Sequence, residues 1–488
     1  MNSLYVWISL FSWIGVATAI AYLAKRGLGE GVTEYFLGGR RLGGFISGMT
    51  YSATTYSAFM LVGLVGLTYE SGVGALGFEM TYLTFTVFLL AIFAPRFWIA
   101  SNKYDFVTPA ELLSTRYESK WVGVVAALVF LVMLVPYAAV QLMGIGFLVE
   151  GLTGGEIPYM AGVIVMAVFA GFSALWAGMR SVSWTDAFQA LTMLTTSLFA
   201  LFYLFYHFFG SPVSFFRTIS LENTELLKLS WDPRLFIGLA LPWAFFALTN
   251  PQVSQRMFIP DRISSLKRMI VYFSVFGFIY TIISTLFGFQ AANLLPGLTN
   301  PDKAMPALLT KIPTALGLVI FIGIFAAATS TLGSVILTLS SAVSRDVAKA
   351  LVPHISERNE LLAGKVFIPV LLGATVLFAW LQPGLIAVLS SMASGGLLVT
   401  APALIGAFFW KRGTGVGVLS SMVVGGVITG LMYATGYKPL GWWPSVWGLG
   451  ITSLIFVTVS IFTTRPRKSE KFVESINSEV KALGAKRD

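Results

Sequence analysis

The chain has 488 residues, of which 56% are hydrophobic and only 11% are charged, and its formal net charge is +10. Soluble domains carry about 25% charged residues, so this composition argues against a soluble multi-domain enzyme and against a disordered chain. The absence of cysteine excludes disulfides, thiolate catalysis and cysteine-ligated metal sites. The two histidines, His207 and His354, leave little for a histidine-based metal centre. We therefore expect a polytopic membrane protein.

Taken in chain order, the sequence contains thirteen apolar runs long enough to cross a membrane, for which about 20 predominantly apolar residues are needed. The first run has no basic segment before it and no small-residue cleavage site after it, so we expect a retained span rather than a signal peptide. The predicted spans are 4–24, 43–68, 76–95, 121–150, 158–178, 184–209, 235–257, 269–293, 315–343, 364–382, 384–410, 414–435 and 443–463.

The distribution of basic residues predicts the orientation. If the N-terminus lies outside, most of the 32 Lys and Arg residues fall in cytoplasmic connections and in the tail. Cytoplasmic loops of membrane proteins carry such an excess. We therefore predict one transmembrane domain, 1–464, in the cytoplasmic membrane and a basic cytoplasmic tail, 465–488. The basic residues left outside are Arg217, Lys228, Arg234, Lys303, Lys311 and Lys438.

The tail also carries apolar residues at near-helical spacing. A helix lying on the inner membrane surface and a solvated tail both fit this pattern, and the sequence leaves the two open. The apolar residues concerned are Phe472, Val473, Ile476, Val480 and Leu483.

Two predicted spans carry residues that interrupt a helix. The second contains the hydroxyl-rich segment 53–58, and the seventh contains Thr249, Asn250 and Pro251, whose proline lacks a backbone donor. A broken helix inside a bilayer is tolerated only beside a cavity or a bound ion. Two breaks five spans apart indicate an inverted-repeat transporter, with repeats at about 43–209 and 235–410. Taken singly, a hydroxyl-rich packing face or a proline kink is an alternative explanation.

The ninth span places polar groups on one face. Ala327, Ser330 and Thr331 stand at positions i, i+3 and i+4 of the predicted helix. Two hydroxyls and a carbonyl there, with carbonyls freed in the second span, predict an all-oxygen shell for a hard monovalent cation. The alternative is a small-residue contact between helices.

Few ionisable residues fall within the predicted spans, and two of them are carboxylates near the start of a span. Glu79 lies near the start of the third span and Asp186 near the start of the sixth. An intramembrane carboxylate is costly and is a functional candidate by default. Both lie near predicted boundaries, where a solvated position, or for Asp186 a helix cap, is the alternative.

Several segments, in order along the chain, resemble the sodium/solute symporter family, which includes transporters of proline, pantothenate, sialic acid and sugars. The resemblance covers roughly residues 30–435. The segments that carry it are 35–43 (YFLGGRRLG), 108–112 (TPAEL) with Arg116 and Tyr117, 178–186 (GMRSVSWTD) with Gln189, 327–332 (AATSTL), and 402–406 with Trp410, Lys411 and Arg412.

This resemblance implies an all-α LeuT-type fold of two inverted five-helix repeats plus three further helices. It also implies a shared sodium site, formed here by the carbonyls of Ala53, Tyr56 and Ala327 and the hydroxyls of Ser330 and Thr331. Asp186 would assist sodium release. The substrate site would involve Thr55, Ser57, Glu79 and Asn250.

Some positions depart from the family patterns. Thr55 replaces the aspartate of the proline transporters, and no lysine follows Glu79 where the sugar transporters carry one. Some members of the family hold a second sodium ion with the aspartate that corresponds to Asp186 and with further hydroxyl groups of the ninth span. Here Ser330 and Ser334 match, but Gly333 lacks the hydroxyl.

We therefore predict a sodium-coupled symporter that imports a small organic solute by alternating access, preferably a small carboxylate such as proline, pantothenate or a monocarboxylate. The expected partners are the solute, sodium as coupling ion and membrane lipid, with no enzymatic activity, organic cofactor or nucleic acid. A proton-coupled carrier of the same fold and a sodium/sugar symporter are the alternatives.

Overall fold

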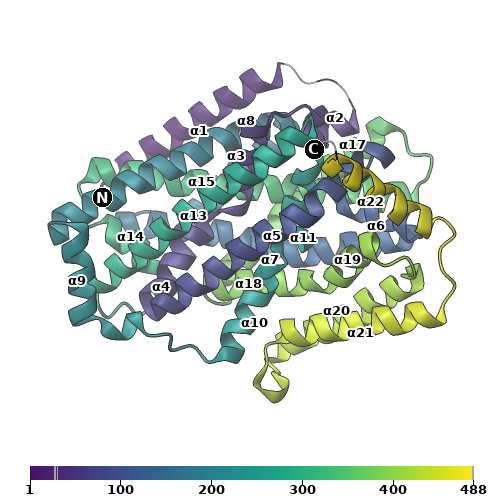
Figure 1. Cartoon of the computed structure of the whole chain (residues 1–488). Coiled ribbons are helices and arrows are strands. Elements are labelled where there is room, and N and C mark those ends of the chain that lie inside the picture. The colour runs from purple at the N-terminus through teal and green to yellow at the C-terminus, as the bar shows by residue number, and fades with distance from the viewer. Residues whose placement is uncertain (27–28, 30, 486–488) are drawn as a thin grey trace.

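The computed structural model describes residues 1–26, 29 and 31–485, which form helices and connecting segments (Figure 1). Eleven helical stretches in this part are long and apolar enough to cross a membrane. They are α1 (Ser3–Lys25), α5 (Val73–Tyr104), α7 (Lys120–Thr153), the two parts of α8 (Tyr159–Trp176 and Gly178–Phe209), α13 (Ile263–Leu294), α15 (Thr314–Ser341) with its extension to Leu351, α17 (Glu357–Leu381), α18 (Ile386–Leu397) with α19 (Ala401–Phe409), α20 (Gly415–Thr435) and α21 (Pro444–Phe462).

The other two predicted spans, the second and the seventh, are broken. The second consists of α3 (Gly44–Thr55), a short π-helical turn (Phe59–Gly63) and α4 (Leu64–Ser71). Between them Tyr56 is extended, with φ −95° and ψ 104°. The amide of Ala58 donates to Oε1 of Gln141 on α7 at 3.1 Å, and the amide of Phe59 donates to Oγ of Ser57 at 3.1 Å. Side chains thus satisfy backbone groups that the break frees.

The seventh span is divided in the same way. It consists of α10 (Pro233–Ala244), α11 (Phe246–Thr249), α12 (Pro251–Ser254) and a 3₁₀ turn (Gln255–Phe258). Asn250 is extended, with φ −88° and ψ 105°, because the following proline disfavours the helical conformation. The two breaks therefore have nearly the same backbone geometry, as expected of corresponding positions in two repeats.

Helix α8 changes direction at Gly178, whose φ of 63° and ψ of 176° suit glycine. The expected loop of residues 179–183 is helical instead, so Asp186 lies inside a helix and is only 1% exposed. Neighbouring Thr185 donates to the carbonyls of Ser181 and Val182 in the same helix, so its side chain lies in the helix interior and not at a cap. The boundary position expected for Asp186 is therefore wrong.

The tail forms α22 (Ser469–Ala485), which packs against α5 and α19 (Figure 1). Phe472, Val473 and Ile476 are buried, and the ring of Phe472 stacks on Tyr104 at 5.1 Å. The apolar face of the tail thus covers the protein itself.

Met1 and the C-terminal helix α22 lie toward opposite ends of the helix bundle (Figure 1). The amino group of Met1 donates to the carbonyl of Leu152, at the end of α7. At the other end, Lys103 pairs with Glu479 of α22, and Lys120 begins α7. We name this second end the basic end, because Arg40, Lys103, Lys120, Arg345 and Lys411 gather there. The placement agrees with an odd number of membrane crossings.

Candidate functional site

Helix α15 contacts the break in the second span through its hydroxyl face. Oγ of Ser330 donates to the carbonyl of Ala53 at 2.9 Å and to that of Ala327 at 2.9 Å. Oγ1 of Thr331 donates to the same Ala53 carbonyl at 3.1 Å. Four of the five residues expected at the cation site thus lie together, and the fifth, Tyr56, is the extended residue of the break.

This cluster offers uncharged oxygens, the ligands that sodium finds at unwound helices of transporters. Within the described residues, no group of three or more His, Asp or Glu side chains could hold a metal ion. The arrangement therefore suits a monovalent cation bound by carbonyls and hydroxyls.

A second set of polar groups gathers around the two breaks. Glu79 on α5 is 0% exposed, and in the described part of the chain neither carboxylate oxygen has a hydrogen-bond partner. The Thr55 hydroxyl, the Asn250 amide nitrogen and the Gln252 amide are likewise buried without partners there. Buried polar groups are normally paired, so these groups are available to a bound molecule.

Aromatic rings connect the two breaks. The ring of Tyr82 lies 6.3 Å from that of Tyr56 and 5.4 Å from that of Phe246, and Tyr137 lies 6.2 Å from Phe246. Thr55 and Ser57 flank Tyr56 in the first break, and Asn250 follows Phe246 by one helical turn in the second. The expected substrate residues therefore belong to one central region.

Sequence reasoning missed several members of this region. Gln141 and Gln252 are polar residues inside apolar runs, a signal that was available. Trp243 gave no such signal, because tryptophan is common in membrane helices. Its Nε1 donates to Oγ of Ser391 on α18 at 2.8 Å, and its ring stacks on Phe59 at 5.0 Å. Helix α18 thus closes the region from a further side.

A cavity of about 260 Å³ lies between this region and the end opposite the basic end. Its lining includes Gly63, Glu70, Leu239, Asp302 and Trp443. Oδ2 of Asp302, in the loop between α13 and α15, accepts from the amide of Ile386 at 3.0 Å. Burial raises the pKa of Asp302 to about 7, and the charge of Glu70 adds to the rise.

The basic end, in contrast, is closed by polar contacts. Gln255, just beyond the second break, donates to the carbonyl of Val107 at 2.9 Å and to Oγ of Ser341 at 3.1 Å. It also accepts from Thr338 at 2.8 Å. These bonds join the broken seventh span to α15 and to the loop of residues 105–108 that follows α5.

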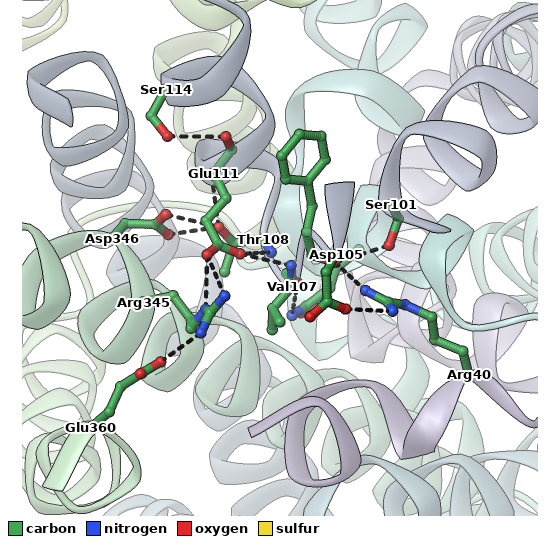
Figure 2. A network of polar contacts seen from close by, with 12 residues as sticks. Arg40, Ser101, Asp105, Val107, Thr108, Glu111, Ser114, Arg345, Asp346 and Glu360 are labelled. Atoms are coloured by element: carbon green, nitrogen blue, oxygen red, sulfur yellow. Dashed lines mark hydrogen bonds and ion pairs between the residues drawn. The ribbon is translucent and has the colours of Figure 1, made fainter. Parts of the chain in front are cut away.

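Figure 2 shows the network around this loop, which connects α5 to α6 (Pro109–Arg116), and around α6 itself. Arg345 pairs with Glu111 at 2.7 Å and with Glu360 of α17 at 3.1 Å. Thr108 donates to the carboxylate of Asp346 at 2.8 Å, and Arg40 pairs with Asp105 at 2.7 Å. The loop and α6 therefore join three other segments at the basic end, those of Arg40, of Gln255, and of Arg345 with Asp346.

Asp186 lies beside the α15 cluster and not among the solute residues. It accepts from Thr50 at 2.6 Å and pairs with Arg256 at 3.5 Å. A cavity of about 30 Å³ is lined by both Asp186 and Ser330. The expected release residue thus adjoins the expected cation site.

The sequence profile of the sodium:solute symporter family matches residues 35–425. The chain belongs to this family. It is 28% identical over 473 residues to the sodium/pantothenate symporter of Escherichia coli, covering 94% of this chain and 97% of the relative. It is 25% identical to the sodium/proline symporter of Haemophilus influenzae, covering 90% of each chain.

Among solved structures, a Na⁺-coupled sialic acid symporter in a substrate-bound, outward-open state has the same fold. The TM-score is 0.79 at 20% identity, and the match covers 94% of this chain and 98% of that one. The expected LeuT-type fold is therefore confirmed. The protein is a multi-pass membrane protein and a sodium-coupled solute symporter, not an enzyme.

Proposed function

We propose that the symporter imports a small carboxylate-bearing solute by alternating access, with sodium bound between α3 and α15. The observation that carries this proposal is the contact of Ser330 and Thr331 with the carbonyl of Ala53, at the point where α3 ends. Sodium bound to Ala53, Tyr56, Ala327, Ser330 and Thr331 would fix the broken span against α15. Solute would then bind between the two breaks.

The proposed orientation has the N-terminus outside and the basic end in the cytoplasm. Sodium moving inward then follows the membrane potential, which supplies about 2.3 kcal/mol per charge at 100 mV. The two repeats, at about 43–209 and 235–410, would rock against each other around the central site. The closed basic end and the cavity at the opposite end support an outward-facing arrangement.

The solute class rests on the chemistry of the central region. The relatives named above are transporters of pantothenate and proline, both carboxylates. A carboxylate would accept from the amides of Ala58 and Phe59 in place of the side chains of Gln141 and Ser57. The free oxygens of Glu79 would accept from a hydroxyl or an ammonium group elsewhere on the same solute.

The purified protein in proteoliposomes tests this function. Labelled proline, pantothenate, pyruvate, lactate, acetate, sialic acid and galactose are screened with inward sodium, lithium, potassium and proton gradients. We expect uptake of at least one carboxylate that bears a hydroxyl or an amine, driven by sodium. Uptake of galactose alone would overturn the carboxylate assignment, and uptake driven by protons alone would overturn sodium coupling.

A further inference from the structure

A fully buried ion pair lies next to the proposed sodium site. The side chain of Arg256 is 0% exposed and that of Asp186 is 1% exposed, and Nη2 of the guanidinium lies 3.5 Å from Oδ2 of the carboxylate. Arg256 comes from the 3₁₀ turn after the second break, and Asp186 comes from α8. The pair therefore joins two elements that lie far apart in the sequence.

The remaining partners of the pair belong to the elements that bind sodium in our proposal. Nε of Arg256 donates to Oγ1 of Thr54 at 3.1 Å, and Nη2 donates to Oγ of Ser334. Thr54 follows Ala53 directly, and Ser334 is one helical turn beyond Ser330. Thr54 and Ser334 also bond each other at 3.0 Å. The guanidinium thus occupies the space between the two elements, on the basic side of the sodium residues.

A buried carboxylate in a membrane protein needs a counterion. A second transported sodium ion could supply that charge, and so can a charge built into the chain. Here the guanidinium of Arg256 supplies the charge, and it also donates a hydrogen bond to the Ser334 hydroxyl. A sodium ion added beside Asp186 would meet a like charge at short distance in a poorly screened interior.

We propose that Arg256 is the built-in counterion of Asp186 and that the symporter therefore binds one sodium ion per transport cycle, at the site of Ala53 and Thr331. This inference rests on the proposed function and adds the coupling ratio to it.

A second sodium ion, which would contradict the proposal, would have to bind in the small cavity beside Asp186. It has a volume of about 30 Å³, enough for one water molecule or one dehydrated cation. Its polar lining consists of Ser173, Thr185, Gln189, Thr329 and Ser330 together with Asp186. Asp186 is the one charged residue in this lining, and its charge is already paired with Arg256. A sodium ion in contact with Asp186 would lie close to the positive guanidinium that pairs with the same carboxylate, so we assign water to the cavity.

Counting bound ²²Na⁺ on the purified full-length protein, with no solute present, tests the inference. We expect one ion per chain and a Hill coefficient of about one in the wild type. Two ions per chain would overturn the inference. No bound ion at all would instead defeat the sodium site of the proposed function, so the two failures are distinguishable.

Variants test the role of the guanidinium itself. Arg256→Gln leaves the Asp186 charge without its partner, so we expect a second ion, which the double variant Arg256→Gln with Asp186→Asn loses again. Arg256→Lys keeps the charge and should bind one ion. Arg116→Gln is the matched control, because Arg116 is also buried but donates to the carbonyls of Ala407 and Trp410. A folded Arg256→Gln protein that still binds one ion would overturn the role of Arg256.

Discussion

The hydroxyl of Thr331 donates a hydrogen bond to the carbonyl of Ala53, 3.1 Å away on the other side of a helix contact. This carbonyl lies three residues before the extended Tyr56, in the last turn of α3. A single backbone oxygen thus joins the end of a broken helix to the middle of a continuous one. Whatever binds at this oxygen controls how the two helices lie together.

Removing either hydroxyl should weaken sodium binding. We expect Ser330→Ala and Thr331→Ala each to raise the half-saturating sodium concentration of uptake about 10-fold or more, since a bond to a charged group contributes about 1.5–3 kcal/mol. Thr331→Ser keeps the oxygen and should stay near wild type. Thr285→Ala is the control, because within the described residues that hydroxyl bonds carbonyls of its own helix, those of Thr281 and Ile282. Equal effects in the control would contradict a sodium role.

Glu79→Gln should impair solute binding while leaving sodium binding intact. The substitution replaces one free acceptor by a donor, so a hydroxyl or ammonium of the solute loses its partner. We expect the KM for solute to rise about 10-fold or more, with solute-free ²²Na⁺ binding unchanged. Glu150→Gln, which removes a surface contact with Lys303, should alter neither quantity. An unchanged KM would remove Glu79 from the solute site.

Asp302 should make stability depend on pH. Its pKa rises from 3.8 to about 7 because the carboxyl is buried, so between these values the folded protein holds a proton that the unfolded chain has lost. Stability should therefore fall as the pH rises through this window. Thermal unfolding in detergent between pH 5 and pH 8 measures the slope of stability against pH.

Two variants assign that slope to its source. Asp302→Asn removes the charge while its oxygen can still accept from Ile386, so the slope should flatten. Glu70→Gln removes the neighbouring charge that helps to raise the pKa of Asp302. The pH range over which stability falls should therefore end at a lower pH in this variant. A slope that survives in Asp302→Asn would have another origin.

The docking of α22 should depend on its apolar face more than on its ion pairs. The ion pairs of Lys411 with Glu470 and Glu474 are about half exposed, and such pairs contribute only about 0–1 kcal/mol each. Ile476, in contrast, is 0% exposed. We expect Ile476→Asp to release the helix, because it places a charge in that contact.

Limited trypsin digestion at Arg467, Lys468 and Lys471 reports this release. Cleavage should be about tenfold faster in Ile476→Asp, which corresponds to a loss of about 1.4 kcal/mol in docking, and unchanged in Ser478→Asp, where the side chain is exposed. High salt should have little effect on the wild type. Rapid cleavage of the wild type in 1 M NaCl would show that charge holds the helix instead.

Features set by local chemistry were predictable from the sequence. Apolar length predicted the spans, and the residues of 53–58 and 249–251 predicted where two of them break, because proline and hydroxyl residues act on their own backbone. The shared face of Ala327, Ser330 and Thr331 follows from helical periodicity alone. The error in the boundary near Asp186 has a local cause too, since α8 bends at Gly178 and continues as helix through residues 179–183, which lie between two predicted spans.

Features set by contacts between distant segments were not predictable in this way. Arg256 lies at the edge of an apolar run, and nothing in its neighbours indicates that Asp186 and Ser334 surround it. The support of the first break by Gln141 and the docking of α22 are of the same kind. Such pairings depend on how helices cross, which periodicity in a single chain does not contain.

The position of α22 also offers an observation point on the transport cycle. The helix rests on α5 and on α19 at once, so any separation of their basic ends must tilt or detach it. Because the chain has no cysteine, Ser478→Cys would carry a single dye on the exposed side of this helix. Its fluorescence would follow the opening of the transporter in real time, from a place that neither sodium nor solute visits.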